Sequence, residues 1–310
     1  MMKQKGFTLL ELLVVITLLA VLAVGALVAY DGIGENAEST ATAFNTASLD
    51  RAVRNYRAVE GEYPNQWDNL AHPTSGAAAG NSLSTPTSFM PGQVQDVFGS
   101  WNVAGATPAV QARLETVAND VWGTDEIQHV LTIDPTVAPG KMHNEGSNIG
   151  GALETDFDTT QFSYISVVPS VNGANPGAGC LVGGTSVSAT FAGTTTGLAL
   201  AQRLNAMNDA MGIERCHLVV ALGFGGDAAS STSRSSASIV AAPTFGGGGV
   251  LNPAVNYTRY VGLFHVARTS SGASNVTIDE SNFFARPKLI GFVDTLGNPI
   301  DVNIAAATAN

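Results

Sequence analysis

A single carboxylate, Glu11, lies inside an almost uninterrupted apolar segment that runs from Phe7 to Tyr30. On insertion scales a charged side chain at the centre of a bilayer costs about 2.5–3.5 kcal/mol, so this acid needs a compensating partner. If the chain is cut after Gly6, the new ammonium group of Phe7 lies one helical turn from Glu11, on the same face. The ammonium group of a neighbouring copy could fill the same role. The predicted chemistry is therefore charge pairing in apolar surroundings.

The residue types that usually carry catalysis form no recognised motif in the rest of the chain. The five histidines form neither an HExxH zinc motif nor a haem-attachment motif, and no GxSxG elbow or GxxxxGK[ST] phosphate loop occurs. His217 and His265 fall in predicted strands, where a structural role is favoured over a ligand or a base. We therefore predict no enzyme and no cofactor. The histidines are His72, His129, His143, His217 and His265.

Two acidic segments are weak candidates for calcium. Glu154, Asp156 and Asp158 alternate along the chain, and three such carboxylates in a loop could reach one ion. The segment lacks the glycine and the terminal glutamate of an EF-hand, and in a strand the three side chains would simply share one outward face. Asp294 and Asp301 bracket a second candidate, for which a plain hairpin through residues 297–299 is favoured. No metal is therefore predicted.

The chain contains two cysteines, Cys180 and Cys216. In an exported protein a disulfide between them is the default expectation, and two buried free thiols are the alternative.

Charged residues make up only 13% of the chain, against about 25% in an ordinary soluble domain. The net charge is −11, which argues against broad affinity for nucleic acid because phosphate contacts need lysine and arginine. Arg51, Arg54 and Arg57 follow one another at helical spacing, close to Asp50 and Glu60. A solvated or inter-subunit salt-bridged face is favoured over DNA contact.

Residues 7–60 predict one long helix in two halves. Residues 7–30 are apolar all round, and 24 residues rise about 36 Å, enough to span about 30 Å of hydrocarbon. Residues 31–60 are amphipathic, and Gly32 and Gly34 either soften the junction or are simply tolerated. Gly61 and Pro64 then end the helix. The apolar stripe predicted to pack on the head consists of Ile33, Ala37, Ala41, Phe44, Ala52, Tyr56 and Val59.

Residues 61–310 predict a globular α+β head that contains an antiparallel sheet. Its helices are expected at residues 107–121 and 198–211, and residues 223–249, rich in glycine and serine, predict a mobile surface loop. The expected strands are residues 162–168, 216–222, 257–268, 288–294 and 300–304.

The N-terminus resembles the class III signal of type IV pilins and type II secretion pseudopilins. The resemblance rests on Lys3, Lys5, Gly6, Phe7, Thr8, Leu9, Leu10, Glu11, Leu12 and Leu13. It implies a leader of residues 1–6, cleavage between Gly6 and Phe7 by a prepilin peptidase, N-methylation of Phe7, and assembly into a helical homopolymer by an inner-membrane machinery. A secretory signal peptide has a shorter apolar core, and a plain signal anchor gives no reason for Glu11.

Three functions compete at this point. The first is a filament subunit for adhesion, twitching or surface attachment, which leaves the inner membrane as a precursor and becomes an extracellular pilus. The second is a pseudopilin or minor pilin of a secretion or DNA-uptake system. The third is a membrane-anchored exported enzyme or binding protein. The retained Glu11 favours the first two, since minor subunits at a filament tip can lack that acid.

Overall fold

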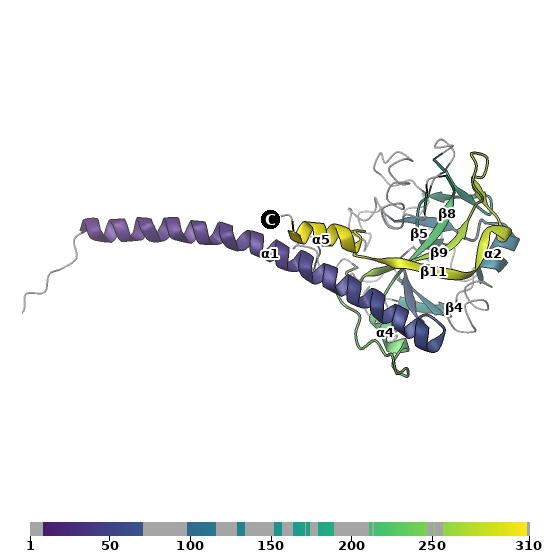
Figure 1. The fold of residues 1–310 in the computed structure, drawn as a ribbon, viewed down its shortest axis with the longest axis horizontal. Coiled ribbons are helices and arrows are strands. Elements are labelled where there is room, and N and C mark those ends of the chain that lie inside the picture. Colours follow the sequence, from purple (N-terminus) through teal and green to yellow (C-terminus); the bar gives the residue numbers. More distant parts are fainter. Residues whose placement is uncertain are drawn as a thin grey trace, which may run out of the picture.

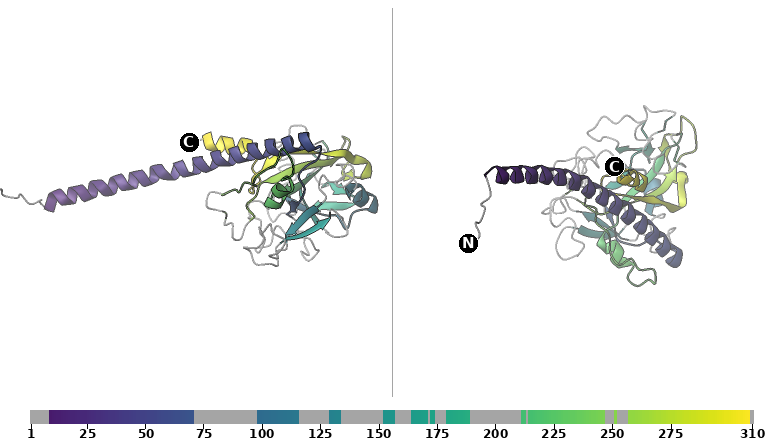
Figure 2. Two further views of the ribbon diagram at one scale, coloured as in Figure 1. Left: turned by 90° about the horizontal axis from the view of Figure 1, so that it is seen from below. Right: turned by 60° about the vertical axis from the view of Figure 1, so that its left-hand side comes forward.

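The structure is a computed structural model, and it describes residues 9–70, 98–115, 129–133, 152–156, 164–170, 172–173, 179–188, 211–212, 214–246, 251 and 257–308. One long helix, α1 (Leu9–Glu60), leads into a head of mixed helices and strands (Figure 1). The second half of α1 lies along the head, and the first half projects away from it in every view (Figure 2). The coarse α+β prediction is confirmed, with a sheet that is mixed.

Helix α1 is continuous over 52 residues, about 78 Å. Its backbone remains helical through Gly32 and Gly34, so a single chain tolerates both glycines. The helix ends as predicted, because Gly61 adopts a φ of 85° and its N–H donates to the carbonyl of Arg57 at 2.8 Å. A left-handed residue at this position closes a helix and is readily accommodated only by glycine.

The sheet follows the order β10-β6-β7-β2-β5-β8-β1-β3-β4, and β9 joins β8 to β11. Among the described pairs, β1 with β3 and β6 with β10 are parallel and the others are antiparallel. The strands are β1 (Trp67–Asn69), β2 (Gly99–Asn102), β3 (His129–Ile133), β4 (Ala152–Asp156), β5 (Tyr164–Val168), β6 (Leu181–Val182), β7 (Thr185–Ser188), β8 (His217–Gly223), β9 (Val261–Arg268), β10 (Thr277–Ile278) and β11 (Phe283–Val293). The shorter helices are α2 (Pro108–Glu115), α4 (Gly226–Ser231), η5 (Glu280–Asn282) and α5 (Ile300–Thr308).

Strand β8 is the centre of the sheet, and all of its residues are buried. Leu218, Val220 and Leu222 contribute to one apolar cluster, whereas Val219 and Ala221 contribute to another. Since successive side chains of a strand point to opposite faces, the sheet is covered on both sides. This explains why the continuous apolar run of β8 was recognisable as a buried strand from the sequence.

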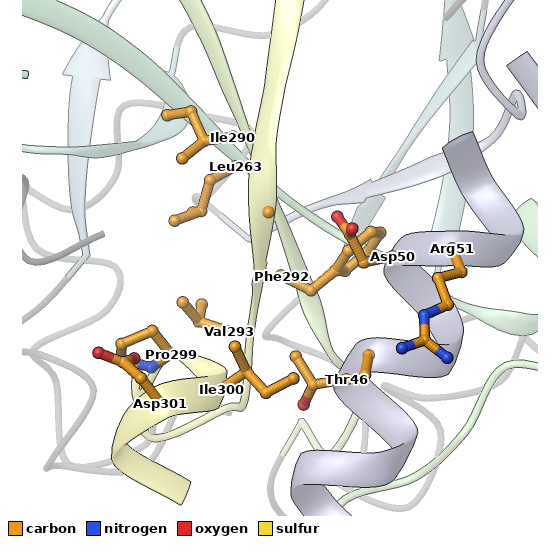
Figure 3. Close-up of a pocket in the computed structure, with 12 residues that line it drawn as sticks. Thr46, Asp50, Arg51, Leu263, Ile290, Phe292, Val293, Pro299, Ile300 and Asp301 are labelled. Atoms are coloured by element: carbon orange, nitrogen blue, oxygen red, sulfur yellow. The ribbon is translucent and has the colours of Figure 1, made fainter. Parts of the chain in front are cut away.

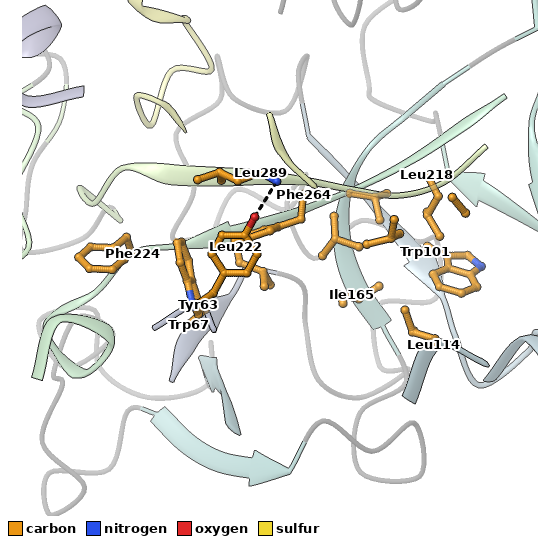
Figure 4. Packing of buried hydrophobic residues seen from close by; sticks show 14 of the residues in the cluster. Tyr63, Trp67, Trp101, Leu114, Ile165, Leu218, Leu222, Phe224, Phe264 and Leu289 are labelled. Carbon is orange, nitrogen blue, oxygen red and sulfur yellow. Dashed lines mark hydrogen bonds between the residues drawn. The ribbon is translucent and has the colours of Figure 1, made fainter. Parts of the chain in front are cut away.

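An aromatic cluster around Trp67 lies on the face of the sheet that also receives the stem (Figure 4). The Trp67 ring packs edge-on against Phe224 and Phe264, at centroid distances of 5.1 and 5.0 Å, and stacks on Phe292 at 6.0 Å. Gly262 allows this approach, because a Cβ atom there would lie 2.7 Å from the Trp67 ring. The indole N–H donates to the carbonyl of Pro64 at 2.5 Å, which satisfies the one polar atom of the buried side chain.

Two arginines of the stem fix α1 to the sheet edge formed by β11. Among the described strands β11 pairs only with β9, so its other edge is open to the stem. The guanidinium of Arg54 donates to the carbonyls of Leu289 and Ile290 at 3.3 and 3.2 Å, and also to Asp50 at 2.8 Å. A solvated or inter-subunit role was predicted for this arginine cluster; Arg54 instead binds the head of its own chain.

Arg57 reinforces this attachment through Tyr63. Its guanidinium donates to the Tyr63 hydroxyl and lies over the phenol ring, with 4.1 Å from Cζ to the ring centroid. The same hydroxyl accepts a hydrogen bond of 3.1 Å from the backbone N–H of Leu289 (Figure 4). Leu49 and Val53 of α1 are buried in the cluster below, so the stem is held by both apolar packing and charge-assisted hydrogen bonds.

Two predictions about the head are wrong. Residues 300–304 are not a strand but the first part of α5, which begins directly after a turn organised by Asp294. Much of residues 223–249 is not a loose loop: α4 forms there, and Phe224, Ala228, Ala229, Ile239 and Phe245 are buried in the main cluster. Thr232 closes this segment by accepting from the N–H of Ile239 at 2.8 Å and donating to the carbonyl of Ala229 at 2.6 Å.

The other predicted elements are present where the structure describes them, although their bounds differ: β5 and β9 are shorter than predicted, β8 is shifted by one residue and β11 is longer. Strands β5, β8, β9 and β11 correspond to four of the five predicted strands, and α2 begins at Pro108 as predicted. The continuation of that helix beyond Glu115 lies outside the described residues, and so does the helix predicted at residues 198–211 except for Met211, which is not helical. The apolar stripe predicted to pack on the head is only partly correct, since Tyr56 is buried but Phe44 and Val59 are exposed.

Candidate assembly surface

The first third of α1 is an apolar rod whose residues, from Leu9 to Leu27, are all exposed. Residues Leu9–Leu27 have a mean hydropathy of 2.7 and none of them is buried. By length and composition this is the one helix in the described part of the chain that could cross a membrane. Leu9 is 83% exposed and Leu27 is 74% exposed, so the exposure extends over the whole segment. An apolar surface of this size is stable in water only when lipid or protein covers it.

Polar side chains are rare on this rod, and they differ in whether the helix itself supplies a partner for them. The hydroxyl of Thr17 donates to the carbonyl of Val14 at 2.9 Å, so the helix itself satisfies it. Glu11 is the only ionisable side chain between Leu9 and Leu27, and it lies exposed in the first turn of α1. The positive end of the helix dipole favours a carboxylate in this position. A partner of opposite charge would stabilise it further once water is excluded. Gly6 and Phe7 lie outside the described residues.

The two cysteines form a disulfide in the head. Cys180 precedes β6 and Cys216 precedes β8, and their Cα atoms lie 5.7 Å apart. The bridge closes a loop with a sequence separation of 36, for which chain entropy gives about 4 kcal/mol of stabilisation. It connects the short strands at one edge of the sheet to its central strand. It therefore stabilises the head and lies away from the exposed rod.

The weak calcium candidates are not brought together among the described residues. Glu154 and Asp156 lie in β4, and Asp158 lies outside the described residues. Asp294 is buried and already accepts four hydrogen bonds, from the N–H groups of Leu296 and Asn298 and from the amides of Asn298 and Asn303. Asp301 is exposed at the start of α5. No group of three or more His, Cys, Asp or Glu in the described part of the chain is arranged to hold a metal.

Burial also affects the protonation of Asp294. It raises the pKa of the carboxyl group, although the hydrogen bonds from Asn298, Asn303 and Leu296 act in the opposite direction. These bonds fix the turn between β11 and α5, which identifies Asp294 as a structural residue.

A buried histidine pair, which the sequence patterns did not reveal, joins β8 to β9. Nδ1 of His217 lies 3.1 Å from Nε2 of His265, and Nε2 of His217 lies 3.2 Å from the carbonyl oxygen of Gly212. Because that carbonyl can only accept, we assign the proton of His217 to Nε2, so His265 donates to Nδ1 of His217. Desolvation lowers the pKa of both rings, that of His265 to about 3, and the nearby charge of Arg268 acts in the same direction. The pair is thus neutral, and it joins the two strands inside the head.

The histidine pair predicts a loss of stability in acid. The pKa of His265 is lower in the folded chain than the 6.5 of an unfolded histidine, so between pH 6.5 and about 3 the unfolded chain binds more protons. Stability is therefore fully present above pH 6.5 and decreases as the pH falls, by up to about 2 kcal/mol at pH 5. His265→Gln keeps a donor for His217 but does not titrate, and we expect it to flatten this slope.

The measurement is denaturant unfolding of the full chain in detergent at several pH values between 5 and 7. Asp294, whose raised pKa has the opposite effect on the slope, is common to both proteins and cancels in the comparison. Equal slopes for the wild type and His265→Gln would contradict the assignment.

Comparison with known proteins identifies the N-terminal segment. Residues 1–27 match the family described as the prokaryotic N-terminal methylation motif. The chain therefore carries a class III signal of the type IV pilin and pseudopilin kind, which implies processing by a prepilin peptidase. No curated protein and no solved structure gives a significant match to the chain. The match ends at Leu27, within α1, and does not extend into the head.

Proposed function

We propose that this chain is a structural subunit of an extracellular, type IV pilus-like filament, and not an enzyme. The main support for this proposal is that the methylation motif occurs together with an exposed rod, which is apolar apart from a single acid near its start. Before assembly the rod spans the inner membrane. After cleavage at Gly6-Phe7 and N-methylation, the same surface packs against the rods of other copies. Protein contacts then replace lipid, and the heads form the outside of the filament.

Glu11 has the central role in this proposal. In the filament its carboxylate pairs with the terminal ammonium group of Phe7 in a neighbouring copy. The pair lies in apolar surroundings, where charges of opposite sign attract strongly and an unpaired charge is costly. The acid thereby favours rods that are placed at the correct axial offset, since only that offset brings the two charges together.

Electron microscopy of the fraction sheared from cells tests this function. Abundant filaments whose main band is this chain would support a major subunit. A trace amount within filaments built from another protein would favour the alternative, a pseudopilin or minor pilin of a secretion or DNA-uptake system. Absence from every filament, together with hydrolase or ligand-binding activity in the purified chain, would favour a membrane-anchored enzyme or binding protein.

Processing provides a separate prediction. Gly6→Val is expected to block cleavage, because a bulky side chain before the scissile bond should not fit the peptidase. The uncut precursor would appear as a slower band on a gel, and no filaments would form. Gly25→Val is the matched control: a Cβ atom there has nothing within 4 Å, and the residue lies well beyond the cleavage position. Normal processing of Gly6→Val would contradict the assigned site.

A further inference from the structure

A cleft lies between the stem and the C-terminal helix, with β11 as its floor (Figure 3). Its volume is about 340 Å³. Thr46 and Ala47 line it from α1, Phe292 lines it from β11, and Ile300 and Asp301 line it from α5. Helix α5 runs antiparallel to α1, from the head toward the exposed rod (Figure 1). Beyond this cleft the two helices lie against each other, and their shared outward surface is called the groove below.

Charged side chains line only the cleft, where Asp50, Arg51 and Asp301 lie; beyond it, the groove lacks charge and exposes apolar side chains. Residues 39–49 of α1 and residues 302–308 of α5 contain no ionisable side chain. Phe44 is 70% exposed, Ile304 is 49% exposed and Val302 is 46% exposed. A surface-facing helix of a soluble head normally places charged residues on such positions. The groove therefore has the composition of a surface that another apolar element covers.

Helical spacing places the exposed residues along the groove itself. On α1, Phe44 shares a row with Ala47 one turn later, and on α5, Ile304 shares a row with Asp301 one turn earlier. Ala47 and Asp301 both line the cleft, so Phe44 and Ile304 continue its two walls toward the rod. Asn303 is buried and donates to Asp294 at 3.2 Å, which anchors α5 in this orientation.

We propose that this groove is the seat for the apolar rod, Leu9–Leu27, of a second copy of the chain; the inference rests on the proposed filament function. The rod is a 19-residue apolar segment of α1 with no buried residue, and the groove continues the same stem toward the head. A third helix placed on α1 and α5 buries the rod together with Phe44 and Ile304. Along residues 39–49 of α1 it meets no lysine, arginine, aspartate or glutamate, and Asp50 and Arg51 follow at the end of the groove nearer the head.

Contact with the membrane does not explain the groove. The nine residues of α5 extend about 13 Å, which reaches from the level of Asp301 to roughly residue 42 of α1. Leu27, at the end of the candidate membrane span, is then roughly 20 Å further along the helix. Lipid that covers the rod of the precursor therefore does not reach Ile304.

The seat defines an axial offset between the two copies that share it, which are a different pair from the two copies joined by Glu11 and Phe7. The centre of the rod is near Leu18, and the part of α1 that lies beside α5, roughly residues 42–50, is centred near Thr46. A second copy shifted along the stem by about 42 Å places its rod beside the groove of the first. With this shift, Leu19 of the second copy lies level with Ala47 of the first, and therefore close to Ile304.

Introducing a charged side chain into the groove tests whether the rod of a second copy binds there. Ile304→Asp is expected to lower the yield of sheared filaments about tenfold or more, because an unpaired buried carboxylate opposes association. Membrane insertion and processing should be unchanged. Val240→Asp is the matched control, since Val240 is 96% exposed and follows α4, which lies on the opposite side of α1 from α5 (Figures 1 and 2). This control should form filaments normally.

Disulfide cross-linking tests the same contact without a charge. Because both native cysteines are already paired, Leu19→Cys with Ile304→Cys adds the only free thiols. Oxidised filaments of this variant should give a ladder of covalent oligomers that reducing agent removes, whereas Leu19→Cys with Val240→Cys should not. The groove inference alone would be overturned if the wild type forms filaments but both expected results fail. In that case Leu19→Cys with Ile304→Cys gives no ladder, and Ile304→Asp forms filaments in normal yield. Failure of the wild type to form filaments would overturn the proposed function and the inference with it.

Discussion

Replacement of Glu11 by alanine is expected to abolish or severely impair filament assembly while membrane insertion remains intact. The variant removes one partner of the proposed ion pair and leaves the ammonium group of a neighbouring Phe7 buried without a counter-charge. Breaking a buried pair in this way costs about 3–5 kcal/mol, which corresponds to a loss of more than about a hundredfold in association. Insertion should not suffer, because the substitution makes the rod more apolar.

Two further variants test whether the charge of Glu11 is what matters on the rod. Glu11→Gln keeps the length of the side chain but removes its charge, and we expect it to behave like the alanine variant. Thr17→Ala removes the other hydrogen-bonding side chain of the rod, whose hydroxyl is satisfied within the helix, and it should assemble normally. Filament yield in the sheared fraction and carbonate-resistant membrane association are the two readouts. Normal filaments from Glu11→Ala would refute the pairing role.

Truncation of Trp67 to alanine is expected to cause the largest loss of stability in the head. The side chain is fully buried, and it contacts Phe224, Phe264 and Phe292. Removing a buried aromatic side chain of this size costs about 3–5 kcal/mol, because transfer energy is lost and a cavity remains. Gly262 cannot fill that cavity, since it has no side chain. Denaturant unfolding of the full chain in detergent, followed by near-UV circular dichroism, measures the change.

The control for this position is Trp67→Phe. It retains an aromatic ring against the same three phenylalanines and loses only part of the contact area and the hydrogen bond to Pro64. We expect it to be clearly less destabilising than alanine. A loss below about 1 kcal/mol for Trp67→Ala would show that the aromatic cluster does not determine the stability of the head.

The stem and the central strands could be predicted because their signals are local. An apolar run followed by an amphipathic pattern predicts a helix from its own residues, and Gly61 marks its end through a backbone conformation that only glycine adopts easily. The buried run of β8 also identifies itself. The same kind of local signal is carried by Glu11, a lone acid in an apolar segment, so the candidate assembly residue was found without a structure.

The parts that were missed depend on contacts between distant residues. Residues 300–304 alternate apolar and polar side chains, which fits a strand as well as a short helix. The hydrogen bonds of Asn298 and Asn303 to Asp294 decide in favour of α5. The glycine- and serine-rich composition after β8 predicts a loop, yet its small side chains are what allow Ala228 and Ala229 to pack against the sheet. The contact between His217 and His265 arises only when β8 pairs with β9.

Mass spectrometry of the N-terminal peptide from sheared filaments tests most directly whether cleavage unmasks the partner of Glu11. We expect the peptide to begin at Phe7 and to carry an N-methyl group on a nitrogen that retains its positive charge. Surface filaments built from chains that still begin at Met1 would contradict the proposed pairing, because the ammonium group would then lie outside the apolar rod and out of reach of the acid.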